Sequence, residues 1–270
     1  MGYHKNEQEI RYILEGGKIL GQILDKLAEM SVAGVSAFAI DQEAEKLIRQ
    51  AGGRPAFKGF RGRKSEPPFP STICASLNDE LVHGAASPDK VLKDGDLFSI
   101  DIGMQYPVNC GWGEGENGFF TDTAITVPVG RISGQNRQLL SVTKQALKVG
   151  IRAARAGKTV ADIGQAIEKY VKPYGLGIVR DLVGHGVGHG VHEEPRVPNY
   201  YDPQLRVWKL EPGVVLAIEP MITLGSCEVR TAADGWSVLT KDGCWCAHFE
   251  HTIVITDSGV QIATKRPSEK

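Results

Sequence analysis

Residues 184–195 read GHGVGHGVHEEP, and this stretch restricts both the fold and the chemistry of the chain. Each of its four alternating glycines would destabilise a helix by about 1 kcal/mol, so we expect an extended backbone here. At ~3.3 Å per residue, His185 and His189 are then about 13 Å apart. One metal ion cannot bind both, and the segment also lacks the H-E-x-x-H spacing of helical zinc proteases.

Two other interpretations apply to this glycine-rich run. A phosphate-binding loop is disfavoured, because the run is followed neither by a Lys-Ser/Thr pair nor by the helix that such loops begin. When the run is considered alone, an alternative is that its histidine rings form hydrogen bonds with backbone groups in a tight turn. The surrounding sequence favours a metal site instead.

Four acidic residues interrupt strand-like segments that are otherwise rich in apolar or β-branched side chains. Any one of them could face solvent, but four buried carboxylates without a partner would be costly. With the imidazole of His185 they carry a charge of about −4, which two divalent ions would balance, and this ligand set suits manganese, iron or cobalt as well as zinc. The four are Asp101 in FSIDIG (98–103), Asp122 in FTDTAIT (120–126), Glu219 in VVLAIEPM (214–221) and Glu250 in HFEHTIVI (248–255).

Hydrophobic periodicity divides the chain into two blocks, 7–128 and 135–256, in which helices precede strands. This order predicts an α+β fold with helices packed on an antiparallel sheet, with two related halves as one way to build it. The basic stretch 54–70, rich in Gly and Pro, is expected to be a surface loop. The expected helices are 7–30, 41–51, 135–156 and 160–174, and the expected strands are 97–103, 121–128, 178–182, 214–223, 228–232, 237–239 and 249–256.

The composition excludes several classes of protein. The 270 residues contain 31 Lys and Arg against 32 Asp and Glu, which argues against partners such as nucleic acid or anionic membrane. No apolar run approaches the ~20 residues of a membrane span, and the first residues lack a signal core, so we expect a cytoplasmic protein. Five scattered cysteines predict reduced structural thiols, and Cys244 and Cys246 lack the second pair of a zinc site.

Further short segments complete an ordered set: SLNDELVHG (76–84), the Asp101 and Asp122 strands, GHGVG (184–188), HEEP (192–195), IEPM (218–221), GWSVLTKD (235–242) and FEHT (249–252). This set resembles the methionine aminopeptidases of the bacterial type (type I) over nearly the whole chain. The resemblance implies the pita-bread α/β fold of creatinase/aminopeptidase-like proteins, with a pseudo-twofold antiparallel sheet covered by helices. It also implies a single catalytic domain over 1–270, in which 257–270 form a C-terminal tail.

The resemblance assigns five metal ligands. Asp101 matches the terminal bidentate ligand of the family, and Asp122 and Glu250 match its bridging carboxylates. His185 and Glu219 match the remaining ligands. The expected cofactors are therefore two divalent ions, with Co²⁺, Mn²⁺, Fe²⁺ and Zn²⁺ as the candidates.

The resemblance also assigns residues that contact the substrate. His83 and His192 match two histidines that do so without binding metal. Phe69, Cys74 and Trp236 fall where the family lines its methionine pocket. A thiol and aromatic rings suit a thioether side chain.

The implied activity is that of a methionyl aminopeptidase, a hydrolase that removes the N-terminal methionine of nascent proteins when the second residue is small. A hydroxide activated by two metal ions would attack the first peptide bond. His192 would stabilise the oxyanion, while Glu219 would shuttle the proton and His83 would orient the scissile amide and assist the leaving amine. The expected partners are the N-termini of nascent polypeptides, with the ribosome surface as a further candidate, and the expected state is a monomer.

The sequence departs from the family pattern between two of the ligands. Twenty residues separate Asp101 from Asp122, about twice the usual number, so 106–118 is expected to form an extended hairpin loop near the site. The loop at 60–70 is also longer and more charged. His189, His248 and His251 are expected to have structural or supporting roles, at the rim, beside the ligands or on the surface.

Two rival functions are disfavoured. An X-Pro dipeptidase would share the five-ligand set, but Gly235-Trp236 and the absence of a large N-terminal domain argue against it. A noncatalytic relative that binds RNA or protein would have lost metal ligands, whereas all five positions are filled here.

Overall fold

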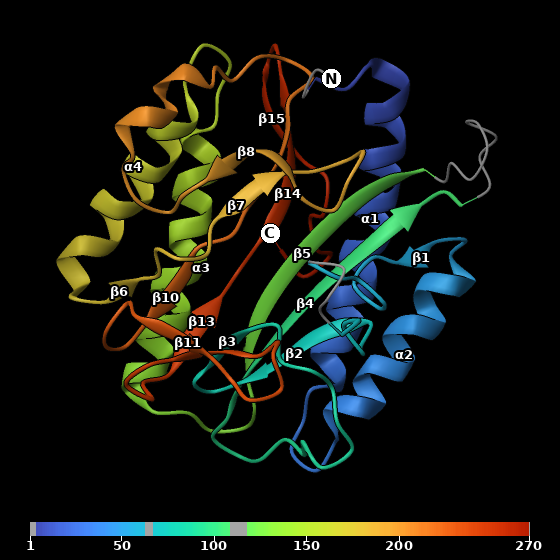
Figure 1. The fold of residues 1–270 in the computed structure, drawn as a ribbon, viewed down its shortest axis with the longest axis vertical. Coiled ribbons are helices and arrows are strands. Elements are labelled where there is room, and N and C mark those ends of the chain that lie inside the picture. Colours follow the sequence, from blue (N-terminus) through green and yellow to red (C-terminus); the bar gives the residue numbers. More distant parts are fainter. Residues whose placement is uncertain (1–3, 63–66, 109–117, 270) are drawn as a thin grey trace.

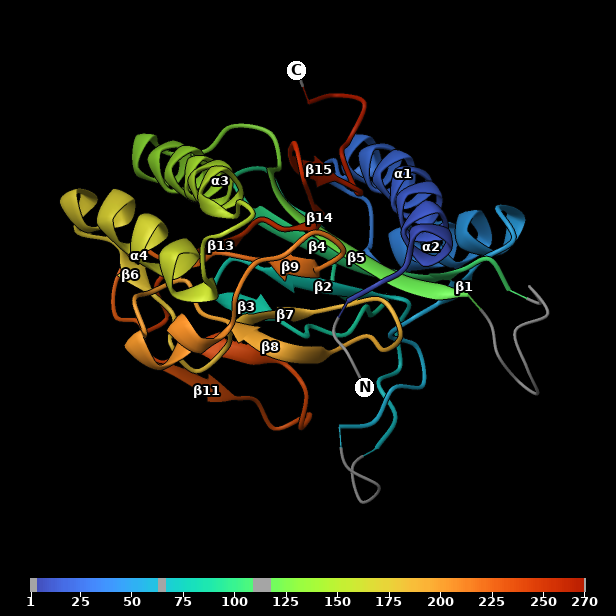
Figure 2. The ribbon, with the colours of Figure 1, turned by 90° about the horizontal axis from the view of Figure 1, so that it is seen from above.

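The computed structural model describes residues 4–62, 67–108 and 118–269, and its helices lie in two pairs on one side of the strands (Figure 1, Figure 2). Figure 2 shows one pair, α1 and α2, beside the strands of the N-terminal half, and the other pair, α3 and α4, beside those of the C-terminal half. The helices are α1 (Glu7–Met30), α2 (Ala37–Gln50), α3 (Gly134–Ala153) and α4 (Val160–Val171), with short 3₁₀ helices η1 (Lys172–Tyr174) and η2 (Pro203–Val207).

The strands pair in antiparallel fashion throughout the described residues, in two larger and two smaller sheets. One larger sheet has the order β1-β4-β2, with β5 also paired to β4, and the other has the order β15-β14-β9-β7-β8. The smaller sheets are β13-β10-β6 and β11-β12-β3. The strands are β1 (Arg54–Pro55), β2 (Ile73–Leu77), β3 (Glu80–Val82), β4 (Leu97–Tyr106), β5 (Phe119–Pro128), β6 (Gly177–Ile178), β7 (Gly184–Gly186), β8 (Glu193–Val197), β9 (Val215–Ile218), β10 (Met221–Thr223), β11 (Val229–Thr231), β12 (Val238–Thr240), β13 (Cys246–His248), β14 (His251–Thr256) and β15 (Gly259–Ile262).

Side-chain caps explain where the helices begin. The Asn6 side chain accepts hydrogen bonds from the first turn of α1, while Glu9 accepts one from the Asn6 backbone in return. Ser36 caps α2 through the Ala39 N–H, so this helix begins four residues earlier than the expected Asp41. The helical segment expected over 160–174 ends where predicted, because Gly175 ends η1 in the left-handed conformation at φ 67°.

Each helix pair buries its apolar face against the larger sheet of its own half. In the N-terminal half, Leu20 and Leu24 of α1 and Ile40 of α2 are fully buried in one cluster with Ile100 and Ile102 of β4. Burial of each such side chain contributes about 1.5–3 kcal/mol. The second half repeats this arrangement, and its cluster contains Leu139 of α3, Ile163 and Ile167 of α4, Leu216 of β9 and Ile253 of β14.

The two halves meet where β5 lies beside the segment that leads into β14. The Thr252 hydroxyl donates to the Asp122 carbonyl at 2.8 Å and accepts from the Asp122 N–H at 3.1 Å. The Glu250 N–H donates to the Ala124 carbonyl at 3.0 Å, and the Thr123 hydroxyl donates to the Glu250 carbonyl at 2.8 Å. The junction therefore fixes two of the acidic residues that the sequence singles out.

Several expected elements differ in their bounds. The strand expected over 214–223 ends at Ile218 and resumes at Met221, because Pro220 has no N–H to donate and restricts the residue before it. Likewise the strand expected over 249–256 begins only at His251, so Glu219 and Glu250 lie in breaks between strands rather than within them. Of the expected strand over 178–182, only Ile178 lies in a strand, as the second residue of β6.

The two segments expected to be irregular are partly ordered. Within the expected loop 54–70, Arg54 and Pro55 form β1 on the edge of β4. In the expected tail 257–270, strand β15 pairs with β14. The centre of the long insertion, 109–117 with Cys110 and Trp112, lies outside the described residues, as do 63–66.

Candidate metal centre and substrate cavity

A cavity of about 270 Å³ opens at the junction of the two halves, and all ten site residues expected from the sequence line it. Its lining combines the four acidic residues and three histidines with apolar and aromatic side chains. The lining residues are Phe57, Phe60, Phe69, Cys74, Val82, His83, Asp101, Asp122, Leu182, Val183, His185, His192, Glu219, Met221, Trp236 and Glu250.

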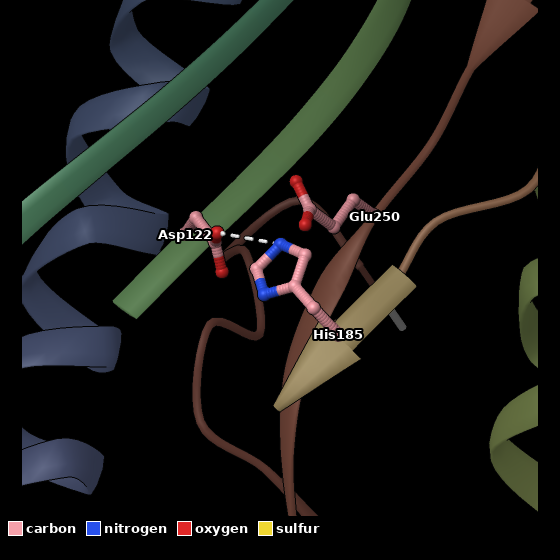
Figure 3. A group of neighbouring side chains, drawn as sticks. All are labelled: Asp122, His185 and Glu250. Carbon is pink, nitrogen blue, oxygen red and sulfur yellow. Dashed lines mark ion pairs between the residues drawn. The ribbon is translucent and has the colours of Figure 1, made fainter. Parts of the chain in front are cut away.

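Three side chains from different strand regions point toward one another in this cavity (Figure 3). Asp122 comes from β5, His185 from β7 and Glu250 from the turn between β13 and β14, and each offers one ligand atom within 4.8 Å of the others. The His185 Nε2 lies 3.4 Å from Asp122 Oδ2. Its Nδ1 is 2.9 Å from the Gly186 carbonyl, and this contact fixes the ring with Nε2 toward the carboxylates.

Glu219 and Asp101 extend the cluster to five potential ligands. Glu219 Oε1 is 3.5 Å from His185 Nε2, and its other oxygen lies 3.3 Å from the Nε2 of His248. Asp101 lies in β4, directly opposite Cys74 of β2 in the strand register. Its Oδ1 is buried without a hydrogen-bond partner, as expected for an oxygen that faces an ion site.

Burial perturbs all four carboxylates in the same direction. Desolvation raises the pKa of Asp101 to about 7 and that of Glu219 to about 8. It also raises the pKa of Asp122 and of Glu250. For Glu250, the charges of neighbouring carboxylates raise the pKa further. Bound cations would offset this repulsion, so the donor set fits divalent ions with oxygen-rich ligation.

Comparison with known proteins agrees with this geometry. Residues 11–257 match the model of metallopeptidase family M24. The chain is 42% identical over 261 residues to methionine aminopeptidase 1 of Bacillus subtilis, and the match covers 97% of this chain and 98% of the relative. The chain belongs to the methionine aminopeptidases of metallopeptidase family M24.

Solved structures confirm the pita-bread fold for this member of the family. The crystal structure of methionine aminopeptidase from Thermotoga maritima superposes with a TM-score of 0.88 at 35% identity and covers 97% of this chain and 98% of that one. The prolidase from Pyrococcus horikoshii superposes with a TM-score of 0.73 at 24% identity, which shows a shared fold alone. This chain covers 65% of that prolidase. In the described part of the aminopeptidase, no helix has the length and apolar character needed to cross a membrane.

Two neutral histidines, His83 and His192, line the cavity of this aminopeptidase together with the acidic cluster. Burial lowers the pKa of His83 to about 4 and that of His192 to about 3, so both rings are uncharged near neutral pH. The His192 ring packs edge-on against His185, with centroids 4.5 Å apart. His83 has a left-handed backbone with φ 58°, a conformation that is strained for a residue other than glycine and often marks a functional site.

Aromatic side chains form the apolar wall. Phe69 and Trp236 pack edge to face with centroids 5.3 Å apart, and Phe60 packs in the same manner on His192 at 5.6 Å. Trp236 is placed by a turn in which Asp234 accepts hydrogen bonds from the Trp236 and Ser237 N–H groups. Phe57 and Phe60 were not expected in the site, although they lie in the same basic loop, 54–70, as the expected Phe69.

The remaining histidines of the two motifs lie outside the cavity lining. His189 is exposed and lies 2.8 Å from Glu9 of α1, consistent with the structural role expected for it. His248 and His251 are 1% and 3% exposed, so the surface position considered for them is wrong and the supporting one remains. Of the cysteines, Cys74 and Cys246 are buried, and the described Cys74, Cys227, Cys244 and Cys246 are all free thiols.

Proposed function

We propose that this cavity removes the N-terminal methionine from polypeptides with a small second residue, with two divalent ions held by Asp101, Asp122, His185, Glu219 and Glu250. One observation supports this most directly: the five potential ligands line the same cavity as Phe69, Cys74 and Trp236. The ions are drawn from Co²⁺, Mn²⁺, Fe²⁺ and Zn²⁺. The catalytic unit is a single domain that spans 1–270.

When bound, the two ions would lower the pKa of a water molecule and polarise the scissile carbonyl. The residues around them have separate tasks. Glu219 is a ligand that also accepts the proton of the attacking water and passes it on. His192 is neutral and donates an N–H to the developing oxyanion.

His83 orients the scissile amide. Because its pKa is about 4, the ring is neutral at pH 7 and acts as a hydrogen-bond partner rather than a charged group. Glu219 then transfers the proton that it has taken up to the leaving amine. His83 assists by holding the scissile amide in position for this transfer.

The aromatic wall selects methionine. Phe69, Trp236 and the Cys74 thiol surround a space into which a thioether can pack, with favourable contacts between sulfur and the ring edges. Desolvation raises the Cys74 pKa well above its ordinary value, so the thiol stays protonated and unreactive. The cavity is small, and this size supports a requirement for a small side chain after methionine.

The substrates in the cell are the N-termini of nascent polypeptides. We place this activity in the cytoplasm, carried out by a monomer, with the ribosome surface as the partner that brings the substrate close. The near balance of 31 basic and 32 acidic residues supports a protein without nucleic acid or membrane as its own ligand.

A peptide panel tests this function. The metal-loaded enzyme is incubated with Met-Gly-Ser, Met-Ala-Ser, Met-Leu-Ser, acetyl-Met-Ala-Ser and the dipeptide Gly-Pro, and free amino acids are quantified. We expect release of methionine from the first two peptides only. Cleavage of Gly-Pro without release of methionine would favour the X-Pro dipeptidase activity instead.

A further inference from the structure

The C-terminal segment 263–269 packs against β14 and β5, the two strands beside Glu250. The Ala263 N–H donates to the Thr252 carbonyl at 2.9 Å, and the Thr264 hydroxyl accepts from the Thr252 N–H at 3.0 Å. Helix α1 approaches the same segment so closely that a Cβ at Gly21 would lie 2.8 Å from the Thr264 carbonyl oxygen. The segment is therefore part of the packed structure rather than a loose end.

Arg266 in this segment is 1% exposed, which is unusual for an arginine. Its Nη2 donates to Glu269 Oε1 at 2.6 Å and lies 3.3 Å from the Nε2 of His251. Its Nη1 donates to the Thr123 hydroxyl and to the Ala124 carbonyl, both at 3.2 Å. The guanidinium thus joins the C-terminal segment to β5.

The two groups that Arg266 holds on β5 are the same two that hold the backbone of Glu250. The Ala124 carbonyl accepts the Glu250 N–H at 3.0 Å, and the Thr123 hydroxyl donates to the Glu250 carbonyl at 2.8 Å. Removal of the guanidinium would leave the Thr123 hydroxyl and the Ala124 carbonyl each with one hydrogen-bond donor fewer. The position of Glu250 therefore depends on Arg266 although the two side chains share no hydrogen bond in the structure.

Stability alone gives a weak reason for a buried arginine at this place. Desolvation of a guanidinium and a carboxylate costs several kcal/mol per ion, and apolar side chains of similar volume often serve as well. A cation with several donors in a fixed planar arrangement can instead hold several acceptors in one geometry. The acceptors here are the Thr123 hydroxyl and the Ala124 carbonyl, which hold the backbone of the proposed metal ligand Glu250.

We propose that Arg266 is a positioning residue of the metal centre, which fixes Thr123 and Ala124 and through them the Glu250 carboxylate for ion binding. This inference rests on the proposed ligand set. Groups behind metal ligands typically change metal affinity or activity by about 10–100-fold when they are removed. We expect Arg266→Met to weaken divalent ion binding by a factor in this range.

The experiment titrates metal-stripped protein with Mn²⁺ by calorimetry and records the visible absorption spectrum of the Co²⁺-loaded protein. The variants are Arg266→Met, Arg266→Lys and, as a matched control, Lys265→Met at the exposed neighbouring position. We expect weaker Mn²⁺ binding and an altered Co²⁺ spectrum in Arg266→Met, partial recovery in Arg266→Lys, and wild-type behaviour in Lys265→Met. A purely structural role would lower the melting temperature and leave the affinity and the spectrum of the folded protein unchanged.

Wild-type Mn²⁺ affinity in folded Arg266→Met would overturn this inference alone, whereas absence of Mn²⁺ binding by the wild type would overturn the proposed metal centre itself. Should Arg266→Met fail to fold, Thr123→Val decides the question. That change removes the hydroxyl between Arg266 and Glu250 at nearly constant volume. Reduced Mn²⁺ affinity in Thr123→Val supports the inference, and unchanged affinity overturns it.

Discussion

At the scale of single residues, the two cavity histidines and the proposed metal ligands have different tasks. His192 and His83 are buried and uncharged near neutral pH, so each can donate one N–H without bringing a positive charge to the ions. The ligand His185 is fixed by the Gly186 carbonyl with its other nitrogen toward the carboxylates. The cavity lining therefore combines charged carboxylates with uncharged imidazoles that can donate hydrogen bonds.

The first prediction concerns His192. Loss of a hydrogen-bond donor to an oxyanion typically lowers kcat by about 10²–10³, so we expect a fall of this size in His192→Ala with little change in Mn²⁺ affinity. Steady-state release of methionine from Met-Ala-Ser measures kcat, and calorimetry measures Mn²⁺ binding. His189→Ala is the matched control, three residues away and exposed, and should retain wild-type kcat. An unchanged kcat in His192→Ala would remove His192 from the mechanism.

At the scale of elements, two of the site residues lie in breaks between strands. Glu219 and Glu250 follow strands that end at Ile218 and His248, and both side chains turn into the cavity where the ladder is interrupted. The apolar pattern around them predicts strands correctly, but periodicity alone cannot locate a break. Pro220 marks the first break in the sequence, since it donates no hydrogen bond. The second break has no comparable mark, because it depends on the Glu250 N–H pairing with Ala124 on the other half.

The loop that carries His192 is held by the N-terminal segment. Lys5, whose side chain is 1% exposed, lies 2.6 Å from Glu193, and Glu193 also accepts from the Gly190 N–H. Removing one partner of a buried ion pair is destabilising by about 3–5 kcal/mol, and partial exposure of Glu193 reduces this to about 2–3 kcal/mol.

The second prediction follows from this contact. We expect Lys5→Met to lower the free energy of unfolding by about 2–3 kcal/mol and to reduce kcat through a less ordered His192. Urea unfolding measures the first effect and methionine release the second. The double variant Lys5→Met/Glu193→Gln should recover part of the lost stability, since no charge is left unpaired. If the double variant is as unstable as the sum of the two single ones, the two residues act independently.

At the scale of the whole molecule, the proposed ligands come from both halves, and the halves meet at the site. The sequence predicts the helices, the ligand set and the family because each depends on local pattern or on short motifs. It misses Arg266, which lies far along the chain from Thr123, Ala124 and His251, and whose burial depends on packing of the C-terminal segment. It also misses Phe57 and Phe60, because a charged loop gives no local sign that its aromatic rings fold inward.

The third prediction concerns the stability of the metal-stripped protein as a function of pH. Folding raises the pKa of Asp101 from 3.8 to about 7 and that of Glu219 from 4.5 to about 8. Between about pH 6.5 and these raised pKa values the folded state binds more protons than the unfolded state, so the free energy of unfolding falls as the pH rises. Below this window the lowered pKa values of His83 and His192 oppose the trend. We expect the melting temperature to fall by about 5 °C between about pH 6.5 and pH 8, since 1 kcal/mol corresponds to about 2–4 °C at this size.

Saturating Mn²⁺ provides the comparison for this scan. Bound ions favour the ionised carboxylates, so the decline toward pH 8 should disappear in their presence. Differential scanning calorimetry with and without Mn²⁺ measures both curves. A melting temperature of the stripped protein that stays constant or rises across the window would contradict the assigned pKa shifts.

The most direct test of the metal-dependent aminopeptidase site is the rate of methionine release from Met-Ala-Ser as metal-stripped protein is titrated with Mn²⁺. We predict no release before addition, full activity once the ions bind, and a loss of at least about 100-fold in Asp101→Asn. The exposed Asp257→Asn is the control and should match the wild type. Full activity in the stripped protein, or in Asp101→Asn, would contradict the account.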